Sequence, residues 1–200
     1  MPEKLERLRK KLDREITFFH MRRAERIIQK ALKIARRDND PFFINYFSAQ
    51  KHILKKNFRK AIEFLDEAIN IRTNDGCSYN DKALCLAEMG FYEEALRWFN
   101  EGIKRDKECI ELYHNKGWLL NFLENYNEAL LCFYKALEFE DNRPETLYSI
   151  ADTYYKIGKY DLSFKYFKKA LDAVRGKSRY IREDIRRRLR ELILYYLPSP

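Results

Sequence analysis

Small residues recur at a spacing of 34 positions along most of this chain, and this period constrains the fold more than any other feature. Small residues seven positions apart lie on one face of a helix and allow close packing, while a large residue between them fills the neighbouring space. Four columns keep the spacing: Ala61, Ala95, Ala129 and Ser163; Phe58, Tyr92, Tyr126 and Tyr160; Leu65, Phe99, Phe133 and Phe167; Ala68, Gly102, Ala136 and Ala170. We call each 34-residue stretch a unit. Each unit therefore contains a helix that must approach its neighbours closely.

A second set of columns predicts another helix in each unit. Its small-residue column consists of Ala49, Ala83, Gly117 and Ala151. Tyr79, Tyr113 and Leu147 precede members of this column by four positions. We expect the two helices of a unit to cross at these columns, so that each unit is an antiparallel helical hairpin.

The pattern resembles the tetratricopeptide repeat family, whose 34-residue period and A-x-x-x-F signature stand here as Ala95-x-x-x-Phe99 and Ala129-x-x-x-Phe133. The resemblance covers four consecutive units, at 42–75, 76–109, 110–143 and 144–177. It implies an all-α fold, a right-handed α-solenoid of antiparallel helical hairpins with the form of a tetratricopeptide superhelix.

Turn residues agree with this division into units. Gly90 and Gly158 lie where the two helices of a hairpin would be joined, and Lys56 and Glu124 occupy that place in the other two units. The stretch 38–41, Asp-Asn-Asp-Pro, offers a capping side chain followed by a proline that suits the first turn of a helix.

Both ends of the chain extend the array in modified form. Ala24, Ile28 and Ala31 indicate a degenerate helical hairpin within 1–41, offset from the next unit by 37 positions. Residues 178–200 predict an amphipathic capping helix, because a solenoid otherwise exposes the surface that its last repeat would offer to another. We expect one continuous solenoid domain. The apolar stripe of the capping helix consists of Ile181, Ile185, Leu189, Leu192 and Tyr196.

Catalytic and ligand-binding motifs are missing from the sequence. It contains no Walker loop, dinucleotide-binding glycine pattern, nucleophile elbow or kinase signature, so we expect a protein that is not an enzyme and has no cofactor. The four cysteines and three histidines are dispersed without the spacing of a metal site. They are Cys77, Cys85, Cys109, Cys132, His20, His52 and His114.

The sequence also gives expectations about location. The longest apolar runs, 129–134 and 192–197, are much shorter than the roughly 20 residues that a membrane helix needs. The first residues mix charges with leucines and lack the apolar core of a signal peptide. We expect a cytoplasmic protein that does not cross a membrane.

Charge is unevenly distributed in a chain whose net charge is +9. Residues 1–41 carry 13 basic and 7 acidic groups, whereas residues 110–143 carry 3 basic and 6 acidic groups. The basic ends, including Arg186, Arg187 and Arg188, make nucleic-acid binding an alternative. We do not favour it, because acids are interspersed and no known reading motif is present.

The resemblance implies that the first helix of each unit lines a concave groove for a protein or peptide segment. Family members that clamp a terminal carboxylate use Lys and Asn there, whereas this chain has Tyr46, Gln50, Asp81, Glu111 and Asn115. An aromatic, mildly acidic groove suits a segment with apolar anchors. The predicted groove residues are Phe43, Tyr46, Phe47, Gln50, Asn80, Asp81, Leu84, His114, Trp118, Phe122, Tyr148, Asp152 and Tyr155.

Two alternatives stay open at this stage. Trp118, the preferred anchor for a partner, could instead pack against the neighbouring repeat. The terminal run 192–197 is apolar on all sides, so Leu192, Ile193 and Tyr196 could dock on a second copy or be covered within their own chain.

Overall fold

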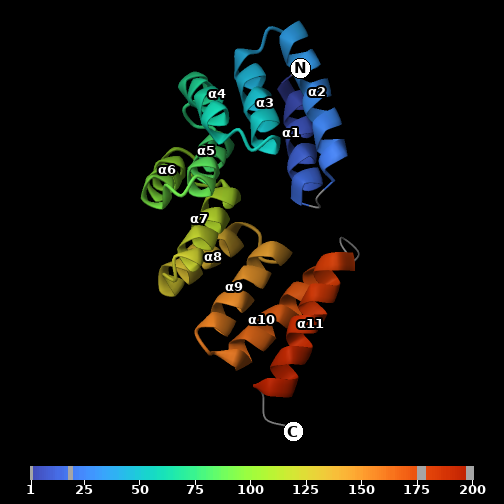
Figure 1. The fold of residues 1–200 in the computed structure, drawn as a ribbon, viewed down its shortest axis with the longest axis vertical. Helices are drawn as coiled ribbons and strands as arrows, with labels where there is room; N and C mark the ends of the chain where they lie inside the picture. The colour runs from blue at the N-terminus through green and yellow to red at the C-terminus, as the bar shows by residue number, and fades with distance from the viewer. Residues whose placement is uncertain (1, 18–19, 175–178, 197–200) are drawn as a thin grey trace. The chain divides into compact units, whose positions relative to one another are not determined.

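The computed structural model describes residues 2–17, 20–174 and 179–196, and all regular secondary structure in these ranges is helical (Figure 1). The chain forms two compact units, Met1–Cys109 and Ile110–Pro200. Unit 1 contains α1 (Pro2–Thr17), α2 (Met21–Arg37), α3 (Pro41–Leu54), α4 (Phe58–Ile71), α5 (Gly76–Glu88) and α6 (Tyr92–Arg105). Unit 2 contains α7 (Ile110–Phe122), α8 (Tyr126–Phe139), α9 (Pro144–Lys156), α10 (Tyr160–Ala173) and α11 (Arg179–Tyr195).

The helix boundaries confirm the predicted period. The second helices α4, α6, α8 and α10 begin at Phe58, Tyr92, Tyr126 and Tyr160, each 34 positions after the last. The first helices α5, α7 and α9 keep the same interval. Consecutive helices of each pair pack as antiparallel hairpins, as predicted from the small-residue columns (Figure 1).

Local capping and turn chemistry explains where several helices begin and end. Asp40 is the capping residue of α3: its side chain accepts a hydrogen bond from the backbone N–H of Phe43 at 3.1 Å. The turn glycines Gly90 and Gly158 have positive φ, at 84° and 75°. The residues in the equivalent turns, Lys56 and Glu124, adopt the same left-handed conformation, with φ of 58° and 62°. Glycine is favoured there but is not essential, because left-handed backbone costs other residues only about 1–2 kcal/mol.

The small-residue columns are buried where paired helices cross. Ser163, which takes the place of an alanine, donates its hydroxyl hydrogen to the backbone oxygen of Ala151 at 2.9 Å, so the close approach also satisfies the polar group. Gly117 has no room for a side chain. A Cβ atom on Gly117 would lie 2.7 Å from Cε1 of Phe133 and 3.1 Å from the backbone oxygen of Ala129.

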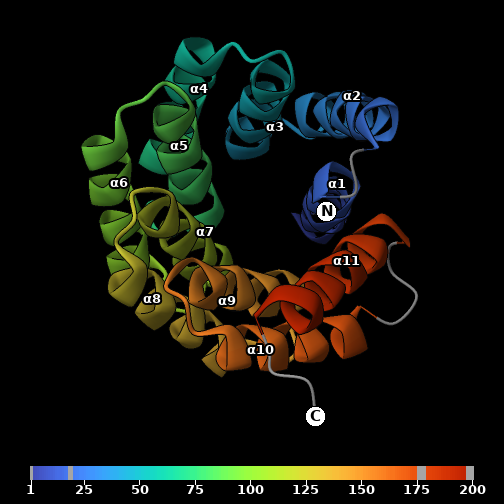
Figure 2. The ribbon, with the colours of Figure 1, turned by 60° about the horizontal axis from the view of Figure 1, so that its bottom comes forward.

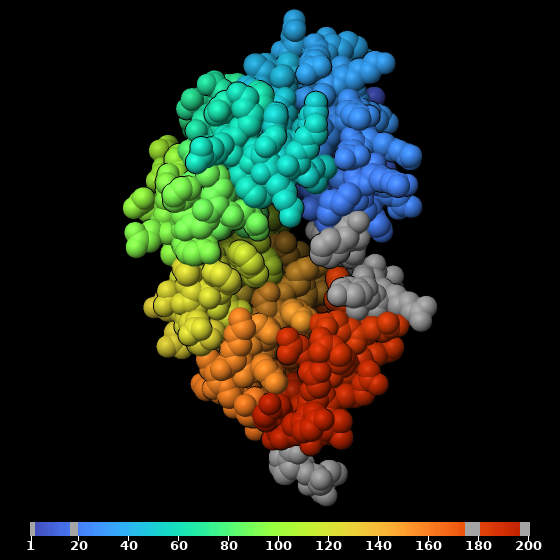
Figure 3. All heavy atoms as spheres, in the orientation of Figure 1, coloured from blue at the N-terminus to red at the C-terminus, as the bar shows by residue number. Residues whose placement is uncertain are grey.

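Helices at the two ends complete the cores of the units. In unit 1, Leu5 and Leu12 of α1 join a core built mainly from α2 and α3. In unit 2, Ile185 and Leu192 of α11 join residues of α9 and α10 in one core. Figure 3 shows α11 lying against the α9–α10 hairpin along one side of unit 2. None of the described helices combines the length and the apolar character needed to span a membrane.

The contact at Gly117 gives a test of close helix crossing. Gly117→Ala gains up to about 1 kcal/mol of helix propensity, but overpacking against Phe133 costs roughly 1–3 kcal/mol. We expect a lower free energy of unfolding in urea. In a Phe133→Leu background, where the ring is removed, the same change should be neutral or stabilising. If Gly117→Ala changed the free energy of unfolding equally in both backgrounds, this account of the helix crossing would be contradicted.

Candidate partner-binding face

The predicted groove residues of unit 1 lie beneath its own N-terminal helix. We call the surface of α3 and α5 that carries these residues the first-helix face of unit 1. Within unit 1, α1 lies on the side of α3 away from α4 (Figure 2). The predicted groove residues that are buried are Phe43, Tyr46, Phe47, Gln50 and Asn80.

Side chains of α1 bind this face by charge and ring contacts. Arg9 lies 2.5 Å from a carboxylate oxygen of Asp75 and 2.8 Å from Glu6. Its guanidinium carbon lies 5.2 Å from the ring centroid of Tyr46. Arg72 pairs with Glu6 at 3.4 Å. Because Asp75 caps α5, α1 contacts not only the adjacent hairpin but also the beginning of the next one.

These contacts correct part of the groove prediction. In this structure Phe43, Tyr46 and Phe47 belong to the core of unit 1 and do not line an open groove. The physical reason is that α1 and α2 supply the apolar cover that the aromatic face of α3 requires. Sequence reasoning missed this role of α1, although its buried Leu5 and Leu12 are separated by the helical interval of seven positions.

Asp81 is the most perturbed acid on this face. Gln50 donates a side-chain hydrogen bond to one of its carboxylate oxygens, and Asn80 donates to the other at 3.1 Å. Burial, reinforced by the nearby charge of Asp13, raises the pKa of Asp81 to about 7. Leu84, one turn further along α5, is half-buried. Asp81 is therefore a destabilising charge at neutral pH.

In unit 2, α11 contacts the groove residues of α9. The Tyr148 hydroxyl donates a hydrogen bond to Asp184 at 2.7 Å, and Arg188 pairs with Asp152 at 3.6 Å. The rings of Tyr155 and Tyr196 meet edge to face at 5.7 Å between centroids. These groove positions are therefore engaged by the chain's own C-terminal helix.

The apolar end of α11 is divided between the core and the surface. Leu192 is fully buried in the core of unit 2, so of the two alternatives for this residue the structure supports cover within its own chain. Its neighbour Ile193 is exposed. Tyr196 is half-covered, because its ring stacks on Tyr160 with 4.2 Å between centroids.

His114 on α7 has a structural environment. Its Nδ1 lies 3.0 Å from the hydroxyl oxygen of Thr146, and its ring contacts that of Phe133 at 5.7 Å between centroids. Burial, with the charge of Arg143 as a further cause, lowers the pKa of His114 to about 3. At neutral pH the imidazole is uncharged, so it can contribute a hydrogen bond to a partner but no positive charge.

Trp118 and Phe122 differ from the other aromatic groove residues because they remain exposed. Their side chains lie one helical turn apart on α7 and stack, with ring centroids 6.2 Å apart and an interplanar angle of 17°. Trp118 is 43% exposed and Phe122 is 55% exposed. On the same helix, Glu111 pairs with Arg143 at 3.5 Å. We call the α7 surface around Trp118 and Phe122 the α7 face.

The repeated hairpins and their small-residue crossings define a helical-repeat scaffold of the α-solenoid class. The tetratricopeptide repeat sequence model matches residues 110–143 and 144–173 of unit 2. The chain belongs to the tetratricopeptide repeat family. Proteins of this family and fold are generally scaffolds for protein interactions and not catalysts.

Comparison with curated and solved proteins agrees with this assignment. The Hsp70-Hsp90 organizing protein 2 of Arabidopsis thaliana is 26% identical over 115 residues, which is 58% of this chain but only 19% of that protein. The crystal structure of TTC0263, a thermophilic tetratricopeptide repeat protein of Thermus thermophilus, matches with a TM-score of 0.73 and 18% identity, covering 95% of this chain and 99% of that one.

A further solved structure is that of YrrB, described as a tetratricopeptide repeat protein with an unusual peptide-binding site. It matches with a TM-score of 0.59 and 16% identity, covering 88% of each chain. At these identities the solved structures establish the shared fold alone.

The raised pKa of Asp81 predicts a specific pH dependence of stability. Because an unfolded aspartate titrates at about pH 3.9, the folded state retains a proton that the unfolded state loses between about pH 4 and 7. The free energy of unfolding should therefore fall as the pH rises through this window, by at most about 1.4 kcal/mol per pH unit. Asp81→Asn should remove this loss and stabilise the protein at pH 8 by roughly 1–3 kcal/mol.

Urea unfolding of the wild type and Asp81→Asn at pH 5 and pH 8 measures the effect. Asp172→Asn, at an exposed position on α10, serves as the control and should follow the wild type at both values. The buried-charge account would be contradicted if the free energy of unfolding changed equally between pH 5 and pH 8 for the wild type and for Asp81→Asn.

Proposed function

We propose that this chain is a non-catalytic protein-interaction scaffold and that the α7 face binds a peptide segment of a partner protein. The partner's large apolar side chains would pack on Trp118 and Phe122. Membership of the tetratricopeptide repeat family supports the scaffold role. The peptide-binding site named for YrrB supports a peptide as ligand by analogy.

The observation that carries the proposal is the exposure of a stacked Trp–Phe pair on a first helix. Elsewhere in the predicted groove, α1 buries the aromatic residues of α3, and α11 contacts those of α9. Trp118 and Phe122 are large apolar side chains that are 43% and 55% exposed. Tryptophan is among the residues that most often contribute large binding energies at interfaces.

The surroundings of the pair favour a particular kind of segment. Residues 110–143 have an acidic excess, and the side chain of Glu111 is 45% exposed. A segment with a large apolar anchor beside a lysine or arginine would match both features. Glu111 brings negative charge to the clamp positions of this first helix, which argues against a terminal carboxylate as the recognised group.

A peptide-display selection on the wild-type protein tests this proposal. We expect the selected peptides to be enriched in large apolar residues and to lose about tenfold or more in affinity for Trp118→Ala and for Phe122→Ala. Leu131→Ala is the matched control, because Leu131 is 69% exposed but lies on the second helix α8. Calorimetric titration gives the affinities, and circular dichroism checks that the helices are retained.

Two results would reject the α7 face as the binding site. One is equal affinity for the wild type and both α7 variants. The other is a loss with Leu131→Ala as large as that with Trp118→Ala.

Self-association is a second candidate function, favoured by one observation at the end of α11. Leu194 and Tyr195 are 73% and 75% exposed, next to the exposed Ile193. We propose that a second copy of the chain could cover these side chains. The basic run 186–188 does not favour nucleic-acid binding as a function, because Arg187 pairs with Asp184 and Glu191 within α11.

Sedimentation velocity over a range of protein concentrations tests self-association. We expect a dimer in the wild type and a monomer in Leu194→Glu, because a charge in an apolar interface is costly to desolvate. Glu191→Gln, one turn earlier on the same helix, should remain dimeric. A wild type that stays monomeric at all concentrations would exclude this candidate and leave the α7 proposal unaffected.

A further inference from the structure

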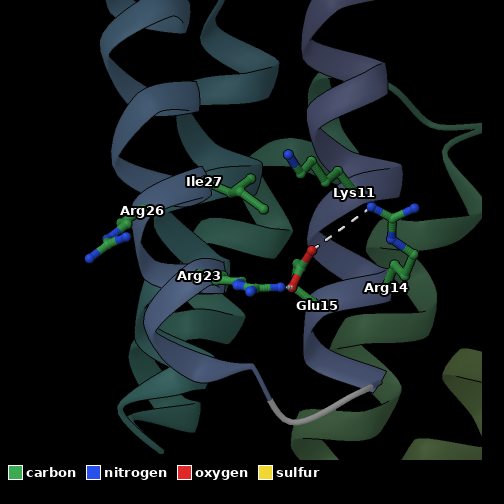
Figure 4. A pocket seen from close by; sticks show the side chains of 6 residues that line it. All are labelled: Lys11, Arg14, Glu15, Arg23, Arg26 and Ile27. Atoms are coloured by element: carbon green, nitrogen blue, oxygen red, sulfur yellow. Dashed lines mark ion pairs between the residues drawn. The ribbon is translucent and has the colours of Figure 1, made fainter. Parts of the chain in front are cut away.

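A basic hollow lies between α1 and α2 in unit 1. Its volume is about 410 Å³. Figure 4 shows Lys11 and Arg23 pointing into the gap between the two helices, whereas the guanidinium of Arg26 points away from α1. The lining residues are Lys11, Arg14, Glu15, Arg23, Arg26 and Ile27.

The four cationic side chains that line this hollow keep most of their capacity for ion pairs and hydrogen bonds. Lys11 and Arg26 form no ion pair with any other residue in the described part of the chain. Arg14 and Arg23 approach Glu15 only at 3.9 Å and 3.8 Å, which is longer than an N–H···O hydrogen bond. Their guanidinium N–H groups are therefore available to an anion.

Glu15 is the one acid among the lining residues, and its position fits a supporting role. Its side chain is only 8% exposed, and its carboxylate lies 2.9 Å from Nδ1 of His20. The carboxylate lies between Arg14 and Arg23, at 3.9 Å and 3.8 Å from their guanidinium groups (Figure 4). Four cations face one buried carboxylate, so the hollow retains a positive excess.

We propose that this hollow binds a small anion with two or more linked phosphates. Lys11 and Arg14 are three positions apart on α1, and Arg23 and Arg26 are three positions apart on α2. Each pair spans about 4.5 Å along its helix, and Lys11 and Arg23 point into the gap from opposite helices, so cations lie on both sides of an elongated ligand. Arginine forks bind phosphate oxygens in pairs, and lysine adds a compact charge.

The lining favours a small phosphate compound over a nucleic acid strand. Among the described residues that line the hollow, Ile27 is the one apolar side chain and none carries an aromatic ring on which a base could stack. The hollow would therefore recognise its ligand through the phosphate groups. Inorganic triphosphate and a nucleoside triphosphate share this chemistry and should bind with similar affinity, whereas orthophosphate should bind more weakly.

Calorimetric titration of the full chain with inorganic triphosphate at low salt tests the proposal. We expect one saturable site, with affinity that falls as salt is added. The double variant Lys11→Gln and Arg23→Gln should lose about tenfold or more in affinity, since two charge-assisted contacts are removed. The matched control, Lys10→Gln with Arg22→Gln, has the same net charge and changes exposed neighbours on the same helices outside the lining.

Several outcomes would overturn the proposal. They are the absence of saturable binding, an equal loss of affinity in both double variants, and tighter binding of a single-stranded RNA oligonucleotide that depends on the same residues. If the first double variant fails to fold, amide shifts of the wild type still decide the matter. Triphosphate should then shift resonances within 8–15 and 20–28, and shifts located elsewhere would refute the site.

Discussion

Close crossing of paired helices is the constraint on which the rest of the structure depends. A helix with an apolar stripe must find a partner surface, and a column of alanine, glycine or serine lets the two backbones approach until a large neighbour fills the remaining space. At Gly117 the ring of Phe133 occupies the volume that a methyl group would take. At Ser163 the same proximity permits a hydrogen bond to Ala151. Repetition of this contact sets the 34-residue period.

The terminal helices determine which parts of the first helices stay accessible. In unit 1, α1 combines buried leucines with Arg9, which contacts Tyr46 and Asp75. In unit 2, α11 contacts Tyr148 and Tyr155 of α9. Each unit thus uses a helix of its own chain as part of its cover. The exposed aromatic pair on α7 differs from the predicted groove aromatics of α3, which are buried, and from those of α9, which contact α11.

The period, the hairpins and their turns could be predicted from the sequence because they arise from local, repeated chemistry. The candidate site could be predicted only as a set of equivalent positions. Gln50, Leu84, Trp118 and Asp152 occupy the same column, yet Gln50 is buried, Trp118 is exposed and Asp152 pairs with α11. A periodic pattern assigns the same environment to every member of a column. The difference comes from packing by α1 and α11, which lie outside the four regular repeats.

Electrostatics explains why the cover provided by α1 is specific without being fully favourable. Arg9 bridges Glu6 on its own helix and Asp75 at the start of α5, which places α1 at a defined position on the first-helix face. Burial of Asp81, reinforced by the nearby charge of Asp13 on α1, raises the pKa of Asp81. Apolar burial of Leu5 and Leu12 must therefore outweigh a like-charge contact that grows as Asp81 loses its proton. The cover over unit 1 is consequently tied to pH, whereas the stacked rings of α7 contain no titrating group.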